Sequence, residues 1–235
     1  MPVHLLPRLL EFIFPTRCVS CGAGGKLLCN NCAAEMAPLE RLNCIVCDRP
    51  AVGGTTHPIC RSRWSPERFL AAFPYRGPAR CLVQALKYKR LRAVARIMAG
   101  LLIGELHEMG IEFGPQAQVV PIPLSFWRKS SRGFNQAELL ARALGEDLRL
   151  EFRPDLLRRV RDTSSQVSLT RSERQANVRG VFAISAELHG EPACAGRDIL
   201  LVDDVVTTGA TAREATRTLK KAGAGQVWVL AFAQD

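Results

Sequence analysis

The 235-residue sequence contains no apolar run of the roughly 18 residues that a membrane-spanning helix needs. Its longest apolar stretches, such as Val227 to Ala233, have the length of a buried strand. The apolar segment Val3 to Phe14 is interrupted by proline, arginine and glutamate, and it has no charged leader before it, unlike a secretory signal. We therefore expect no membrane insertion and a cytoplasmic location.

Acidic and aromatic residues are also scarce. There are 22 acidic residues against 32 basic ones, which leaves a net charge of +10 and favours an anionic partner. Aromatic residues make up only 6% of the chain, so the interleaved aromatics typical of single-strand binding are a weak signal here. The G-x-x-x-x-G-K-[ST], G-x-S-x-G and H-E-x-x-H motifs are absent, which argues against P-loop nucleotide hydrolysis and two common hydrolase classes.

Cysteine, in contrast, is abundant and crowded. Seven of the nine cysteines fall between Cys18 and Cys60, in a chain without an export signal, so metal binding is favoured over disulfides. Two C-x-x-C steps complete one tetrahedral Zn²⁺ site, because each step places two thiolates in one tight turn. The pattern offers eight ligands: Cys18, Cys21, Cys29, Cys32, Cys44, Cys47, His57 and Cys60.

The spacing leaves the pairing of these ligands open. A sequential arrangement puts the first four on one zinc and the last four on a second, and an interleaved arrangement is the alternative. Arg63 stands where a final C-x-x-C step would place its second cysteine, so the second set needs His57. The alternative without metal is a reduced, apolar cluster of cysteines. We expect structural zinc only, since four protein ligands leave no open position, and we interpret Cys81 and Cys194 as ordinary thiols.

The composition changes past Trp64 to apolar periodicity separated by glycine and proline, which predicts a cysteine-rich, zinc-ribbon-like domain at 1–65 and a larger domain at 66–235. Periodicity and capping signals in the larger domain predict the following elements. Helices are expected from about 78, at 92–109, at 137–148 and at 211–222, and strands at 119–123, 150–152, 181–184, 199–202 and 227–232. The last two strands and the helix between them form a βαβ unit, so they should be parallel and the fold α/β.

The turn after the strand at 199–202 is the clearest candidate site. It runs from Asp203 to Thr211 at the carboxyl end of a parallel strand, where ligands bind in open α/β sheets. Threonine hydroxyls and backbone N–H groups around Gly209 meet there at a helix N-terminus and suit one phosphate. Asp203 and Asp204 can accept hydrogen bonds from ribose hydroxyls and attract Mg²⁺. The alternative is a solvated acidic loop before a capped helix.

The segment Ile199 to Thr211 resembles the phosphoribosyl diphosphate (PRPP) binding motif of type I phosphoribosyltransferases. With the cysteine module, the whole chain resembles the ComF (ComFC/GntX-like) family. Three further stretches support the resemblance: Pro121-Ile122-Pro123-Leu124, Arg132-Gly133-Phe134-Asn135-Gln136, and Ser165-Gln166 followed by Arg174 and Asn177. It implies a parallel sheet flanked by helices, preceded by a double zinc ribbon.

The resemblance also implies roles for individual residues. Asp203 and Asp204 would be the catalytic pair that holds the ribose hydroxyls, and residues 161–180 would form a flap over the substrate. The flap agrees with the polar character of that segment, since loops of this length are usually functional or disordered. The implied PRPP-binding or phosphate-binding residues are Val205, Val206, Thr207, Thr208, Gly209, Ala210, Thr211, Pro121, Arg132, Gln166 and Arg174.

Two functional hypotheses follow. In the first, the protein is a Mg²⁺-dependent phosphoribosyltransferase with an unidentified acceptor, linked by its family to competence and DNA uptake. In the second, it is a non-catalytic competence factor that binds single-stranded DNA through the zinc module and basic faces, together with proteins of the competence machinery. A degenerate scaffold is disfavoured because the Asp203 to Thr211 turn is intact.

Overall fold

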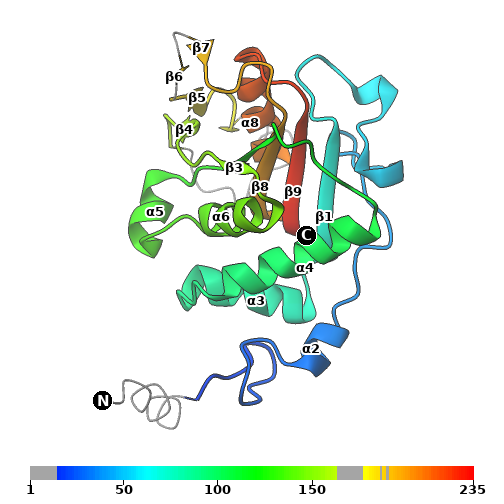
Figure 1. Cartoon of the computed structure of the whole chain (residues 1–235), viewed down its shortest axis with the longest axis vertical. Helices are drawn as coiled ribbons and strands as arrows, with labels where there is room; N and C mark the ends of the chain where they lie inside the picture. The colour runs from blue at the N-terminus through cyan, green and yellow to red at the C-terminus, as the bar shows by residue number, and fades with distance from the viewer. Residues whose placement is uncertain (1–14, 163–176, 186, 189–190) are drawn as a thin grey trace.

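The computed structural model describes residues 15–162, 177–185, 187–188 and 191–235. Its centre is a five-stranded sheet with the strand order β1-β9-β8-β2-β3 (Figure 1). All four strand pairings are parallel, which confirms the α/β fold and the parallel βαβ unit. None of the helices within these described ranges is both long and apolar enough to cross a membrane.

Apolar runs form most of the strands, apart from the two-residue β3 and the end of β8. Their bounds are β1 Arg68–Pro74, β2 Gln118–Pro121, β3 Glu151–Phe152, β8 Ile199–Val206 and β9 Val227–Gln234. Strand β2 ends at a proline, as predicted, since proline has no N–H for a sheet hydrogen bond. Strand β8 continues four residues beyond the predicted Val202, because Val205 and Val206 still pair with β9. Asp203 and Asp204 therefore stand on the strand itself.

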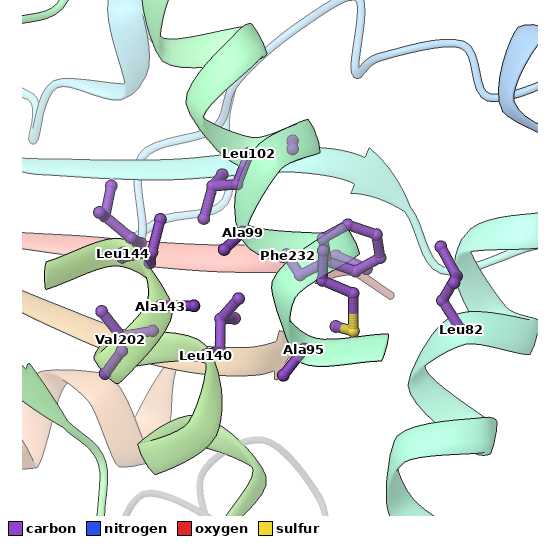
Figure 2. Close-up of a cluster of buried hydrophobic side chains, with 14 of the residues drawn as sticks. Leu82, Ala95, Ala99, Leu102, Leu140, Ala143, Leu144, Val202 and Phe232 are labelled. Carbon is purple, nitrogen blue, oxygen red and sulfur yellow. The ribbon is translucent and has the colours of Figure 1, made fainter. Parts of the chain in front are cut away.

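Helices cover both faces of the sheet, as the burial of alternate strand residues requires. On one face, Leu200 and Val202 pack with α3 (Gly77–Tyr88), α4 (Val94–Glu108) and α6 (Gln136–Leu148). On the other, Ile199 and Leu201 pack with α8 (Ala210–Lys221). Figure 2 shows the first of these layers, with Leu140 and Leu144 of α6 beside Val202.

The remaining elements are short. They are α2 Asn30–Ala34, the 3₁₀ turns η1 Val52–Gly54 and η2 Pro58–Cys60, α5 Phe126–Arg132, and the antiparallel pairs β4 Leu157–Arg159 with β5 Phe182–Ile184 and β6 Glu187–Leu188 with β7 Glu191–Pro192. Strand β1 and helix α5 are absent from the sequence-based prediction, although the buried run Phe69 to Phe73 has the length and apolarity of a strand.

Candidate functional site

The carboxyl end of β8 carries the two adjacent carboxylates. Asp204 is buried, and its Oδ2 lies 2.5 Å from Nζ of Lys87 on α3. Asp203 is half-buried, and its Oδ1 accepts the backbone N–H of Asp204 at 2.9 Å. Burial and the neighbouring Asp204 carboxylate raise the pKa of Asp203 well above its usual range, and Lys87 offsets only part of this effect. The protonated form of Asp203 is therefore favoured, and a cation bound beside the pair would offset the repulsion between the two carboxylates.

The turn after these carboxylates leads into α8. Gly209 adopts a left-handed conformation, with φ of 68°, as the residue before the helix. The first N–H groups of a helix have no partner within it, so this end favours an anion. Thr207 and Thr211 line a cavity at this end of the sheet. Val206 and Ala210 are buried in the second core, the hydrophobic cluster between the sheet and α8, so only their backbone groups could serve a ligand.

The opposite wall comes from the loop after β2 and from α5. Ser125 begins α5 by accepting the N–H of Arg128, and Gly133, with φ of 78°, ends it. Asn135 then begins α6 by accepting the N–H of Ala137, and its Nδ2 donates to the carbonyl of Ile122 at 3.0 Å. This side chain thus fixes the β2 loop against α6.

Arg132, at the end of α5, is held in place by the buried Gln136, whose Oε1 accepts from its Nη1 at 2.8 Å. The guanidinium also lies 5.5 Å from the ring centre of Tyr88. The stretch Arg132 to Gln136 therefore has a structural explanation: it ends one helix, begins the next and orients an arginine.

These parts enclose a cavity of about 320 Å³, of a size to hold a small phosphorylated sugar. It brings together six of the predicted site residues: Asp203, Asp204, Val205, Thr207, Thr211 and Arg132. Its other lining residues are Tyr75, Lys87, Ile122, Pro123, Leu124, Ser125, Arg128, Arg159 and Asp235. Four of the lining residues are basic: Lys87, Arg128, Arg132 and Arg159. Burial and the positive charge of Arg128 lower the pKa of Arg159.

Several predicted residues lie elsewhere. Pro121 is buried at the end of β2, one residue before the lining begins. Thr208 and Gly209 belong to the turn but are not among the lining residues. Gln166 and Arg174, with most of the predicted flap, lie outside the described residues. Sequence reasoning did not find Lys87 and Tyr75 as site residues, because no motif marks a residue that reaches a site from a distant element.

The first cysteine group consists of Cys18, Cys21, Cys29 and Cys32, whose sulfur atoms all lie within 4.8 Å of one another. The Sγ atoms of Cys21 and Cys29 are 3.6 Å apart. A tetrahedral site with Zn–S bonds of about 2.3 Å places its sulfurs about 3.8 Å apart, so this donor set fits zinc. The first group therefore follows the sequential arrangement.

The second group, Cys44, Cys47, His57 and Cys60, also lies within 4.8 Å, with Nδ1 of His57 3.3 Å from Sγ of Cys47. The other ring nitrogen, Nε2, donates to the carbonyl of Pro50 at 3.0 Å. A carbonyl can only accept, so this hydrogen bond leaves Nδ1 as the metal-binding nitrogen. Histidine thus supplies the ligand that the missing cysteine at Arg63 would have supplied.

The thiols of the second group titrate far apart. A hydrogen bond from the backbone of Arg49 is the main cause that lowers the pKa of Cys47 to about 6, against the opposing effect of burial. Burial, followed by the neighbouring Cys47 and Cys44, raises the pKa of Cys60 to about 11. Burial and the neighbouring thiols thus disfavour the Cys60 thiolate, and a bound zinc ion would supply the positive charge that offsets this effect.

Zinc content gives the first prediction. Reduced, freshly purified protein is expected to contain two zinc ions per chain by elemental analysis, one for each ligand group. Cys60→Ser should lower the content to one. Cys81→Ser, at a half-buried thiol outside both groups, should leave it at two. Less than one zinc per chain in the wild type would contradict the assignment.

Comparison with known families agrees with this geometry. Residues 110–234 match the phosphoribosyl transferase domain family, and residues 9–62 match the double zinc ribbon domain family. The protein is therefore a phosphoribosyltransferase-domain protein with an N-terminal zinc-binding module.

Comparison with individual proteins identifies the family of the whole chain. The chain is 32% identical over 167 residues to competence protein F of Haemophilus influenzae, covering 68% of this chain and 70% of that protein. It is 32% identical over 213 residues to the DNA utilization protein YhgH of Salmonella typhimurium, covering 86% and 89%. Competence protein ComFC of Streptococcus pneumoniae is 29% identical over 204 residues, covering 85% and 84%. The chain belongs to the ComF family.

Proposed function

We propose that this protein binds Mg²⁺ and PRPP at the cavity on the end of β8 and transfers the phosphoribosyl group to an acceptor, as part of competence or DNA utilization. The observation that carries the proposal is the meeting of the Asp203–Asp204 pair, the Thr207 to Thr211 turn and the arginines of α5 around one cavity. The names of the relatives supply the link to competence. We place its action in the cytoplasm, with domains at 1–65 and 66–235.

Each part of the cavity has chemistry for one part of PRPP. Asp203 and Asp204 accept hydrogen bonds from the ribose hydroxyls, as carboxylates do. The N–H groups at the start of α8 and the hydroxyls of Thr207 and Thr211 donate to the 5′-phosphate. Arg128 and Arg132 line the same cavity, and we assign them to the diphosphate because guanidinium groups bind phosphates bidentately.

The residues present also fit Mg²⁺. The ion prefers a few carboxylate ligands together with water and phosphate oxygens, and the adjacent carboxylates of Asp203 and Asp204 at the cavity offer the first. When bound, Mg²⁺ neutralises charge on the departing diphosphate. The protein's own contribution is to hold the donor so that its C1–diphosphate bond breaks as the acceptor bonds to C1, and to bind the leaving group.

Calorimetric titration of PRPP into the wild-type protein tests the proposal. We expect saturable binding with Mg²⁺ and about tenfold weaker binding without it, since neutralising one charge pair in a partly buried site is worth at least about 1.4 kcal/mol. Ribose 5-phosphate should bind more weakly than PRPP and compete with it. Absence of any PRPP binding, with or without Mg²⁺, would refute the proposed donor site.

A second candidate function has an observation of its own. Phe126 and Trp127 on α5 are 70% and 73% exposed, and their rings meet edge to face. Tyr88, 69% exposed, lies nearby under Arg132. Exposed aromatics beside arginine and lysine suit stacking of unpaired bases. This surface supports the second hypothesis, binding of single-stranded DNA, which we keep as the alternative proposal.

A further inference from the structure

The second zinc group (Cys44, Cys47, His57 and Cys60) lies against the turn Thr207 to Thr211, which is the proposed phosphate-binding turn. Ile45, which lies between the ligands Cys44 and Cys47, is buried in the second core together with Ala210 of α8. A β-carbon added to Gly209 would lie 2.6 Å from Cγ1 of Ile45 and 3.3 Å from its carbonyl oxygen. The contact is therefore so close that only glycine fits at this position of the turn.

Arg213 fastens the same contact by hydrogen bonds. It stands one helical turn after Gly209 and donates its backbone N–H to the Gly209 carbonyl at 2.9 Å. Its Nη1 donates to the carbonyls of Ile45 and Val46 at 3.3 and 3.2 Å. One side chain thus joins the start of α8 to both residues between the two cysteine ligands.

A metal ion would restrict the shape of this short turn. Cys44 and Cys47 flank Ile45 and Val46, and the backbone closes through the N–H of Asp48 on the Cys44 carbonyl at 2.8 Å. Two sulfurs bound to one ion keep a four-residue turn in a single conformation, because the metal supplies folding free energy to such modules. Zinc in the second group would therefore also fix the position of Ile45 against Gly209.

We propose that the second zinc group is a positioning element for the phosphate-binding turn, acting through Ile45 and Arg213. Zinc at Cys44, Cys47, His57 and Cys60 holds Gly209 and the start of α8 in the conformation that receives a phosphoryl group. Zinc at the second group and PRPP at the turn therefore strengthen each other's binding. This inference rests on the proposed PRPP site, and neither Ile45 nor Arg213 lines the cavity.

Linkage sets the size and symmetry of the effect. Coupling between two sites is reciprocal, and couplings of about 5- to 150-fold are usual. If loss of zinc weakens PRPP binding by some factor, PRPP must strengthen zinc binding by the same factor.

The first group provides a matched control, since Figure 1 places α2, which carries Cys32, at the far end of the molecule from α8.

The test measures PRPP affinity by calorimetry in three variants, each with its zinc content. Cys60→Ser should lose one zinc and bind PRPP about tenfold more weakly. Ile45→Ala should keep both zinc ions and still bind several-fold more weakly, so a positioning effect is separated from metal loss. Cys21→Ser, in the first group, should bind as the wild type does. Cys60→Ser and Ile45→Ala proteins that both bind within twofold of the wild type would overturn the inference.

Two further readouts do not depend on transfer activity. With a chromogenic zinc chelator, PRPP should slow the release of zinc from the second group, and Arg213→Met should remove this protection. Without any ligand, amide hydrogen exchange in residues 207–213 should be faster in Cys60→Ser than in Cys21→Ser. Equal exchange would overturn the coupling, whereas a wild type that binds no PRPP would overturn the proposed function instead.

Discussion

Replacing both carboxylates, as Asp203→Asn/Asp204→Asn, is expected to weaken Mg²⁺-dependent PRPP binding by about 100-fold or more. A hydrogen bond to a charged group contributes about 1.5–3 kcal/mol and one to a neutral group about 0.5–1.5 kcal/mol, so replacing two carboxylates by amide oxygens loses about 2–3 kcal/mol before the cation is considered. Asparagine keeps the size of each side chain at the end of β8. The measurement is calorimetric titration with Mg²⁺ present.

The matched control for this change is Asp147→Asn, which removes an exposed carboxylate of α6 outside the cavity. It should bind PRPP as the wild type does. The substitution also removes the ion pair between Asp204 and Lys87, so folding must be checked. Thermal unfolding of the double variant should show a folded protein. A double variant that still binds Mg²⁺ and PRPP at the wild-type affinity would show that the pair has no part in the site.

The same variant separates the two candidate functions. If transfer matters, the Asp203→Asn/Asp204→Asn protein should fail in a cellular test of DNA uptake or utilization while it still binds single-stranded DNA. If strand binding alone matters, Phe126→Ala/Trp127→Ala should cause the failure, because it removes the exposed aromatic pair. Full cellular function of the aspartate variant would exclude the transferase hypothesis.

A methyl group added at Gly209 should have the second largest effect. Gly209→Ala is expected to lower stability by about 2–4 kcal/mol and to weaken phosphate binding by about tenfold or more. About 1–2 kcal/mol comes from placing alanine at a positive φ, and the remainder from overlap with Ile45. The turn can relieve the overlap only by moving away from Ile45, which displaces the N–H groups that would bind the phosphate.

The chain offers a close control in Gly196, which has the same φ of 68° but nothing within 4 Å of an added β-carbon. Gly196→Ala should show only the backbone cost and leave PRPP binding unchanged. Combining Gly209→Ala with Ile45→Ala should be less destabilising than the sum of the two single changes, since it removes the colliding atoms. Equal thermal midpoints for Gly209→Ala and Gly196→Ala would show that Ile45 does not press on the turn.

Local sequence patterns predicted much of this structure. The C-x-x-C spacing indicated two sets of ligands, because residues three apart in a tight turn necessarily face one ion. The candidate turn was predictable since all its parts are contiguous, and apolar runs around it indicated a parallel βαβ unit that the structure confirms. The predicted ends of the strands were less accurate. Strand β8 continues through Val206, because pairing with β9 outweighs the polarity of the two aspartates.

The sequence by itself determined the candidate metal ligands, the parallel βαβ unit and the loop with its carboxylates and threonines, since each depends on neighbours along the chain. Only the tertiary structure decided what surrounds that loop. It placed β1 at the sheet edge beside β9, brought Lys87 and Arg159 into the cavity, and pressed Ile45 against Gly209. These contacts join segments up to 168 residues apart, as from Ile45 to Arg213. They follow from strand order and helix packing, which short-range patterns of polarity do not encode.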